Sequence, residues 1–302
     1  MRKRRGITPD DAQRWIKQGF GQGQGQSYRP FFNVRDVPSR GRSCKVLGID
    51  TGRIHHYLSD LEYYCHVLVE YDQTVTDIRE QYALLPYERP QWIARTLGLK
   101  YPTYPGTKTP IVMTSDLVLT VGALHQNPPS VLCVKPSKAL DPANPKSRRT
   151  LEKLAIEKIY WDLLGCPFNL VTEHDIPIVR AKNLIFFRTS IVAEEFDFLN
   201  TYLPEFPALF DSVWAPDLLL MEILGRIADI LGLDAASCFC LTGRAVWLRL
   251  LDIDIDTEIL HHHQPVRRNA PQGGNAWLKS TTSLAPLLMQ QPSLKGSIDS
   301  ST

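Results

Sequence analysis

The sequence predicts an α/β protein in which a mixed sheet, flanked by helices, is followed by a second, mainly helical domain. Up to residue 172, β-branched apolar runs alternate with segments of helical periodicity. Beyond about residue 175 the pattern becomes mainly helical, and after residue 262 it becomes polar and rich in Gln, Ser and Pro. We therefore expect domains at residues 1–175 and 176–262, followed by a disordered tail at 263–302.

Length and composition exclude several protein classes. The chain has 302 residues, enough for two domains with their own cores. It contains no apolar run near the ~20 residues of a membrane span. Its six Cys show no CxxC motif, which favours a reduced, cytoplasmic compartment. The basic start at Met1 is not followed by an apolar segment, so we expect no export.

Charge is distributed unevenly along the chain. Residues 1–60 contain twelve Lys and Arg against five Asp, whereas residues 191–260 contain three Arg against thirteen Asp and Glu. A polyanion would be attracted to the first region and repelled by the second. Scattered surface cations are common, but clustering favours phosphate contact, so we expect DNA contacts in the N-terminal half and protein contacts in the C-terminal half. The candidate DNA-binding residues are Arg29, Arg40, Arg42 and Lys138.

The first sixty residues predict one helix and a glycine-rich connection. Thr8 is a suitable N-cap because Pro9 and two acidic residues follow it, and the helix should end near Gly19. The glycines between Gly19 and Gln26 follow a helix rather than a strand, which argues against a dinucleotide-binding loop. A flexible connection is the better interpretation.

Three strands and three further helices are expected between residues 59 and 172. A helix should run from Ser59 to about Glu70, and Ser59 with Glu62 forms a capping-box pattern that would explain this acid structurally. The other expected elements are an extended segment at 73–85, a helix at 90–97, a hairpin of strands at 111–121 and 130–134, a helix capped by Thr150 and ending near Leu164, and a strand at 167–172.

The second domain is expected to contain short helices within 184–202, 215–231 and 235–250. Apolar and acidic residues alternate strictly from Leu251 to Asp256, which predicts a strand with an acidic outer face. Short helices followed by one strand suit a winged-helix-like domain.

The predicted hairpin carries the candidate chemistry. Asp116 lies on its first strand and Lys135 follows its second, so the two side chains can meet at one end of a sheet. Phosphodiester hydrolysis can use a hydrated Mg²⁺ ion that is held by carboxylate ligands, together with a nearby lysine. An acid followed by an acid-x-Lys pattern is typical of restriction-endonuclease-like folds, but here the position two before the lysine is Cys133, and a thiol is a poor Mg²⁺ ligand. Taken alone, a chance pair or a buried structural ion pair explains these residues better than a nuclease.

Several stretches of the sequence resemble one protein family, and this resemblance favours the nuclease interpretation. Together they run through most of residues 10–172 in the order of the TnsA family, the endonuclease subunit of heteromeric cut-and-paste transposases. The matching stretches are 21–43, 51–62, 77–86, 114–119, 134–136 and 149–161.

The resemblance implies a restriction-endonuclease-like catalytic domain followed by a winged-helix-like domain. It implies cleavage of transposon-end DNA at the 5′ ends with Mg²⁺, or Mn²⁺ as a substitute, beside a TnsB-type transposase and a TnsC-type ATPase regulator. The implied catalytic residues are Glu62, Asp116 and Lys135, and the implied metal ligands are Glu62, Asp116 and the carbonyl of Val134. Cys133 stands where the family usually has Gln.

Two alternatives stay open. In the first, the chain is a catalytically idle DNA-binding subunit that bridges a transposition complex, and Cys133 marks the decay of its site. In the second, it is a self-standing restriction or repair nuclease that cuts DNA without a partner.

Overall fold

The computed structural model describes residues 7–36, 41–122 and 127–268, and these residues divide into two compact units. The first contains the described residues up to Tyr63 and those from Gln73 to Ile176. The second contains Tyr64 to Asp72 and the described residues from Pro177 onward. None of the described helices has both the length and the apolar character needed to span a membrane. All six Cys are free thiols.

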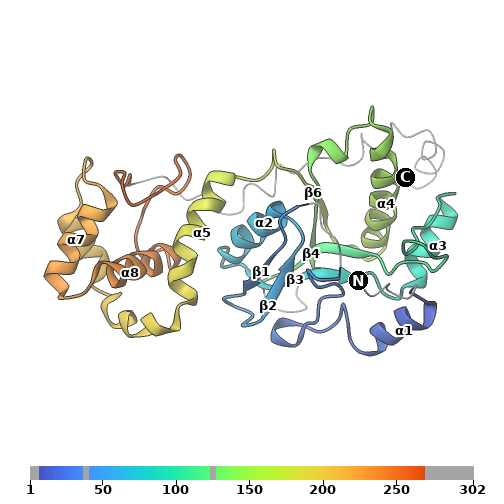
Figure 1. The fold of residues 1–302 in the computed structure, drawn as a ribbon, viewed down its shortest axis with the longest axis horizontal. Coiled ribbons are helices and arrows are strands. Elements are labelled where there is room, and N and C mark those ends of the chain that lie inside the picture. Colours follow the sequence, from blue (N-terminus) through green and yellow to red (C-terminus); the bar gives the residue numbers. More distant parts are fainter. Residues whose placement is uncertain (1–6, 37–40, 123–126, 269–302) are drawn as a thin grey trace. The chain divides into compact units, whose positions relative to one another are not determined.

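A four-stranded mixed sheet organises the first unit (Figure 1). Its order is β3 (Val75–Ala83), β4 (Thr114–Val121), β5 (Ser130–Val134) and β6 (Phe168–Val171). The pairs β3–β4 and β4–β5 are antiparallel, and β5–β6 is parallel because α4 (Pro145–Asp162) provides the crossover connection. These elements confirm the mixed sheet that the sequence predicts. Residues 123–126 of the expected hairpin turn lie outside the described part of the chain.

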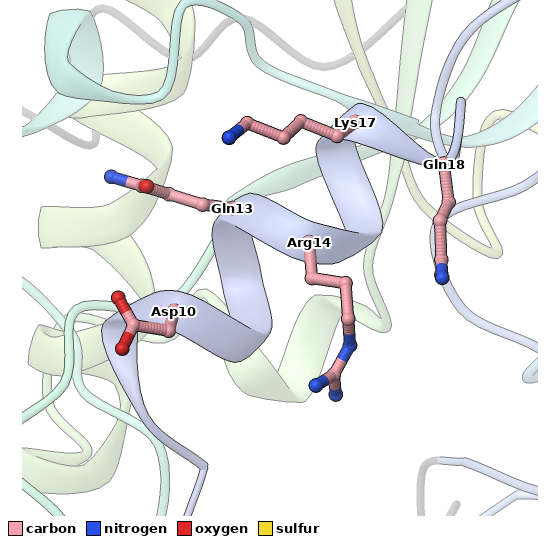
Figure 2. A pocket seen from close by; sticks show the side chains of 5 residues that line it. All are labelled: Asp10, Gln13, Arg14, Lys17 and Gln18. Atoms are coloured by element: carbon pink, nitrogen blue, oxygen red, sulfur yellow. The ribbon is translucent and has the colours of Figure 1, made fainter.

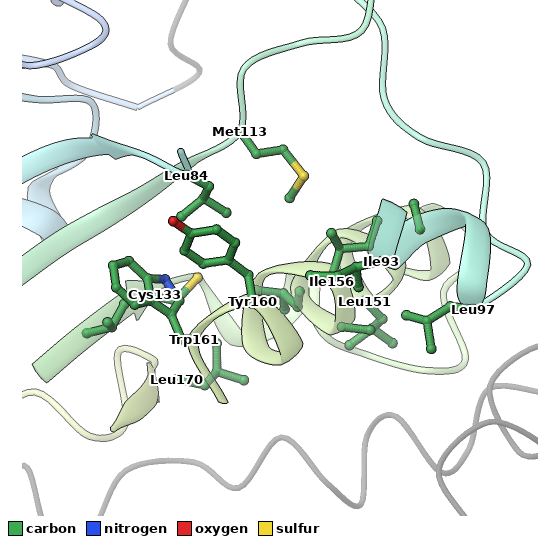
Figure 3. Packing of buried hydrophobic residues seen from close by; sticks show 14 of the residues in the cluster. Leu84, Ile93, Leu97, Met113, Cys133, Leu151, Ile156, Tyr160, Trp161 and Leu170 are labelled. Atoms are coloured by element: carbon green, nitrogen blue, oxygen red, sulfur yellow. The ribbon is translucent and has the colours of Figure 1, made fainter. Parts of the chain in front are cut away.

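Two helices pack on the sheet through its largest apolar core. Residues of α3 (Glu88–Thr96) and α4 join the core together with side chains from β4, β5 and β6. Figure 3 shows Ile93 of α3, and Leu97 just after this helix, near Leu151 and Ile156 of α4. Burial of these apolar side chains fixes the helices on the sheet and so places α4 beside the ends of β4 and β5.

Helix α4 begins earlier than the sequence analysis placed it. The expected N-cap was Thr150, but the helix starts at Pro145 and the side chain of Asn144 accepts a hydrogen bond from the amide of Lys146. Asn at the N-cap followed by Pro at the first helical position is a strong start signal, because Pro lacks the N–H that would be unsatisfied there. The basic residues at 146–149 are therefore helical.

The N-terminal elements complete the first unit. They are α1 (Pro9–Lys17), the 3₁₀ turn η1 (Gly25–Ser27), the antiparallel pair β1 (Cys44–Leu47) and β2 (Ile54–Tyr57), the first turn of α2 (Asp60–Glu70), and the 3₁₀ turn η2 (Ser137–Ala139). Thr8 caps α1 as predicted, with a reciprocal hydrogen bond from Asp11. Ala12 and neighbouring apolar residues pack in a second core with Phe31, Ala83 and Val112.

The glycine-rich segment after α1 packs against β3 instead of forming the open connection that we expected. The amide of Gly21 donates to the carbonyl of Arg29, and the amide of Gly25 donates to Asp77 of β3. At Gly21, φ is +72°, and a Cβ there would lie 2.3 Å from the Cβ of Ala83. Only glycine satisfies both the left-handed backbone and this close approach.

The second unit is helical. Beyond the residues that α2 contributes, it contains α5 (Ile178–Val192), the 3₁₀ segment η3 (Glu194–Tyr202), α6 (Phe206–Val213), α7 (Leu220–Leu231) and α8 (Ala235–Trp247). Its described residues pair only in two isolated bridges, Leu219 with Pro265 and Ile253 with Arg268. The mainly helical character is as predicted, but the winged-helix-like arrangement is not confirmed.

The predicted strand at 251–256 is wrong, and so is the idea that the disordered tail begins at residue 263. The alternation arises because Leu251, Ile253 and Ile255 are buried, while Asp254 accepts hydrogen bonds from a turn and Asp256 pairs with Arg180. Val266 is buried and its carbonyl accepts a hydrogen bond from Trp214. The predicted tail from residue 269 onward lies outside the described residues.

Replacing Gly21 by Ala should destabilise the first unit. The substitution forces a left-handed non-glycine residue, at a cost of ~1–3 kcal/mol, and overpacks the contact with Ala83. Gly19 is the matched control, because its φ is +83° but a Cβ there meets nothing within 4 Å. Chemical denaturation should show a clearly larger loss for Gly21→Ala than for Gly19→Ala. Equal losses would contradict the packing role.

Candidate functional site

Asp116, Val134 and Lys135 form a hydrogen-bonded group at the ends of β4 and β5. The antiparallel register pairs Leu117 with Leu132, which brings Asp116 beside the last residues of β5. One carboxylate oxygen, Oδ2, accepts from the amide of Val134 at 2.7 Å and from Nζ of Lys135 at 2.6 Å. The same ammonium donates to the carbonyl of Val134 at 3.1 Å. A single cation therefore bridges the two oxygens that the sequence analysis proposed as metal ligands.

The charge of Asp116 holds Lys135 in its protonated form. The lysine side chain is only 29% exposed, and burial by itself would lower its pKa. Burial is the largest single effect, but the negative charges of Asp116 and Glu157 and the hydrogen bond to Asp116 together outweigh it and raise the pKa of Lys135 well above its usual range. Lys135 is thus a fixed positive charge at this end of the sheet.

Glu62 is both a helix cap and a neighbour of this ion pair. Its Oε1 accepts from the Ser59 hydroxyl at 2.9 Å, and its Oε2 accepts from the amide of Leu58 at 3.0 Å. The amide of Glu62 in turn donates to Oγ of Ser59, as in a capping box. Burial and then the charge of Asp116 raise the pKa of Glu62 to about 7, while Lys135 acts in the opposite direction. The structure thus places Glu62 within electrostatic range of Asp116 and Lys135, the other two residues that were proposed as catalytic.

Cys133 faces the core rather than contributing an oxygen ligand. Its side chain is fully buried among apolar residues, and its Sγ lies 3.7 Å from Oε2 of Glu157 on α4. Burial, followed by the charge of Glu157, raises the pKa of this thiol well above its usual range. A neutral buried thiol is inert and is no ligand for a hard cation.

Glu157 is a buried acid that the sequence analysis missed. Its Oε1 accepts from the hydroxyl of Ser115 at 2.7 Å, and that hydroxyl accepts from Nε1 of Trp161. Burial and then the charge of Asp116 raise the pKa of Glu157 to about 7. A signal was present, because Glu157 lies three residues after Leu154 and therefore shares the inward face of the helix.

Gln81 is the second residue that the sequence analysis missed. It lies on β3 with its side chain buried, and its backbone has a φ of 48°. Its Nε2 is 3.4 Å from Oε2 of Glu62, and its Oε1 is 3.4 Å from the hydroxyl of Thr114. Nothing in the local sequence marks a strand residue as left-handed when it is not glycine, asparagine or aspartate.

The oxygen atoms at this site suit a hard divalent cation to which the protein supplies only a few ligands. They comprise the carboxylates of Asp116 and Glu62 and the carbonyl of Val134, all oxygen atoms. Mg²⁺ commonly takes one or two protein carboxylates and completes its shell with water and phosphate. In the described part of the chain, no three His, Cys, Asp or Glu side chains converge as a metal site. Two carboxylates and one carbonyl would leave the rest of the shell of such an ion to water and phosphate.

The proposed DNA-binding residues differ in their surroundings. Arg29 donates to the carbonyl of Gln18 and stacks on the ring of Phe20, so it is engaged within the fold. Arg42 pairs with Asp60 but stays 74% exposed, and Lys138 is exposed on η2 just after the site. Arg40 lies outside the described residues.

A hollow of about 350 Å³ lies beside α1 and is separate from these residues (Figure 2). Its lining comes from one helical face, namely Asp10, Gln13, Arg14, Lys17 and Gln18. It contains none of the proposed catalytic groups, so it does not define the candidate site.

A buried ion network fixes the strand that leads to Glu62. Glu80 of β3 accepts from both terminal nitrogens of Arg53, at 2.9 and 2.7 Å, and lies 2.9 Å from Nδ1 of His55 on β2. Burial alone would raise the pKa of Glu80, but the hydrogen bonds from His55 and Arg53 lower it to about 2. Although it adjoins Gln81 in the sequence, Glu80 has a structural role.

Replacing Glu80 by Gln should destabilise the first unit by about 3–5 kcal/mol. The change leaves the guanidinium of Arg53, whose side chain is only 8% exposed, without its anion. Asp162→Asn is the control, because this residue also pairs with a cation but its side chain is 50% exposed. Its effect should stay within about 1 kcal/mol. Similar losses for the two variants in urea denaturation would contradict the structural role.

In the absence of metal, the free energy of unfolding should fall as the pH rises from about 5 to 8. Glu62 and Glu157 have pKa values of about 7 when folded, against ~4.3 for an ordinary Glu. The folded state therefore binds more protons in this range, and its stability decreases as those protons are lost. Denaturation at several pH values should show a flatter dependence for Glu157→Gln than for the exposed control Glu88→Gln. An unchanged slope in Glu157→Gln would contradict the assignment.

Comparison with known proteins agrees with this geometry. Residues 72–173 match the family model described as TnsA-like endonuclease N terminal, a stretch that includes Asp116, Lys135 and Glu157 but begins after Glu62. The chain is 40% identical over 173 residues to the transposon Tn7 transposition protein TnsA of Escherichia coli, covering 57% of this chain and 59% of that relative. The chain thus spans less than two thirds of the length of the curated relative that it matches. The predicted resemblance to the TnsA family is confirmed over part of the chain, and residues 72–173 are similar to the N-terminal domain of TnsA-like endonucleases.

Proposed function

We propose that this protein cuts transposon-end DNA at the 5′ ends of the element by Mg²⁺-dependent hydrolysis, together with a TnsB-type transposase and a TnsC-type ATPase. The observation that carries the proposal is the group at the ends of β4 and β5. There the carboxylate of Asp116 and the carbonyl of Val134 already share one cation, the ammonium of Lys135. This group lies within the stretch that matches the TnsA-like family model, and a transposition protein is 40% identical to the chain over 173 residues.

The residues of the candidate site would have different roles in the reaction. Asp116, Val134 and Glu62 would hold the ion, and Mn²⁺ would substitute for Mg²⁺ because it also accepts oxygen ligands. Such an ion orients the attacking water and neutralises charge on the phosphoryl oxygens. Lys135 places a second positive charge beside the scissile phosphate, and its high pKa keeps that charge present at neutral pH.

Ionisation of Glu62 links metal binding to pH. Without a metal, burial and then the charge of Asp116 raise the pKa of Glu62 and so favour its protonated form. A bound divalent cation favours the ionised form, so binding should release protons near neutral pH. The capping hydrogen bonds from Leu58 and Ser59 hold this carboxylate in place while its charge changes.

A catalytically idle bridging subunit is the second candidate. It is favoured by the side chain of Cys133, which supplies no oxygen, and by the hydrogen bonding between Asp116 and Lys135, which is complete without any ligand. The two candidates differ in metal binding. Calorimetry that detects Mg²⁺ or Mn²⁺ binding lost in Asp116→Ala supports the endonuclease, whereas no binding by the wild type supports the idle subunit.

Replacing Asp116 by Ala should abolish cleavage. We expect the 5′ nicking rate on transposon-end DNA, with Mg²⁺ and the partner transposase, to fall by about 100-fold or more, because the ion loses its main carboxylate. Lys135→Ala should cause a comparable loss. Lys158 and Asp162 are the matched controls, since they form a similar 2.6 Å ion pair elsewhere in the same unit.

Three outcomes would contradict either the assignment of these catalytic residues or the proposed dependence on a partner transposase. Wild-type nicking by Asp116→Ala would overturn the site. Equal losses in Lys158→Ala and Lys135→Ala would show a general effect on folding. Efficient cleavage by the protein without its partner would favour a self-standing nuclease.

A further inference from the structure

The backbone at Gln81 is unusual for a residue inside a strand. It is one of two non-glycine residues with a positive φ in the described part of the chain, and this conformation costs ~1–3 kcal/mol. The pairing on either side of it is regular, since Glu80 pairs with Leu117 and Tyr82 with Ser115. The distortion is therefore confined to the single position that lies across from Asp116.

The neighbouring structure holds Gln81 in this conformation. On one side, Glu80 is fixed by Arg53 and His55, and its carbonyl accepts from the hydroxyl of Tyr28 at 2.8 Å. The carbonyl of Gln81 itself accepts from the amide of Phe31 at 3.2 Å. A strained residue persists when its surroundings over-determine it, and such residues cluster at functional sites.

The side chain of Gln81 connects the elements that carry the proposed acids. Its amide donates to Oε2 of Glu62 in the first turn of α2, and its carbonyl oxygen accepts from Thr114 at the start of β4. The side chain is 3% exposed, so water does not compete for these hydrogen bonds. The carboxylate of Glu62 thus receives donors from its own helix cap on one side and from β3 on the other.

We propose that Gln81 is a positioning residue that aims the carboxylate of Glu62 toward Asp116 and Lys135. The helix cap alone fixes Glu62 to its own turn. The hydrogen bond from Gln81 fixes it relative to the sheet that carries the rest of the site. Its catalytic consequence rests on the proposed endonuclease function, whereas the coupling between Gln81 and Glu62 does not.

Two substitutions distinguish the effect of the side-chain amide of Gln81 from the effect of its strained backbone. Gln81→Met keeps the size of the side chain and the left-handed strain of the backbone but removes the hydrogen-bond donor. Gln81→Gly removes the donor and also relieves the strain, because glycine adopts a positive φ readily. We expect both variants to nick transposon-end DNA about 10-fold to 100-fold more slowly, the range for losing a hydrogen bond to a charged group. Either variant cutting at the wild-type rate overturns the proposal.

A double-mutant cycle tests the coupling without any activity. Measured at a pH above the pKa of Glu62, the shift of the urea midpoint caused by Gln81→Met should be clearly smaller in a Glu62→Gln background than in the wild type, because the charged acceptor is already gone. A purely structural role of Gln81 in β3 predicts equal shifts in both backgrounds and overturns the proposal. If the cycle shows coupling but the wild type cuts no DNA, the proposed function fails while the positioning of Glu62 stands.

Discussion

The register between β4 and β5 is the constraint on which the candidate site depends. Pairing Leu117 with Leu132 sets Asp116 beside Val134, and the same carboxylate oxygen then binds both a backbone amide and the ammonium of Lys135. A slip of one residue would turn Asp116 to the other face of the sheet and separate these groups. The apolar residues of β4 and β5, buried against α4, prevent that slip.

The site concentrates acidic side chains around Lys135. The charge of Asp116 acts on both Glu62 and Glu157, and Lys135 opposes it at each of them. Such a concentration of acids disfavours the fully ionised protein by itself and favours any cation that enters, which is the electrostatic condition for a dissociable metal. Glu80, by contrast, is matched locally by Arg53 and His55 and leaves no charge to recruit a ligand.

Local signals in the sequence predicted much of this fold, and long-range packing explains where they did not suffice. Neighbouring residues alone were enough to predict four features. These are the helix caps at Thr8 and Ser59, the strand at 130–134 and the short strand near 168. The alternation of apolar and acidic residues at 251–256 is the pattern expected of a strand, but here a buried loop produces it. Glu62, Asp116 and Lys135 were assembled through a family resemblance. Gln81 was missed because its conformation is imposed by residues distant in sequence, such as Arg53 and Phe31.

The early start of α4 has a consequence for how its cations can act. Lys146, Arg148 and Arg149 lie on the first turns of a helix rather than in a loop, and Glu152 holds both arginines. A helix fixes the spacing of its residues at 1.5 Å of rise each, so the Cα positions of these cations are set in advance and only their side chains can adjust. A polyanion that approached them would meet charges whose spacing is set by a helix rather than by a flexible loop.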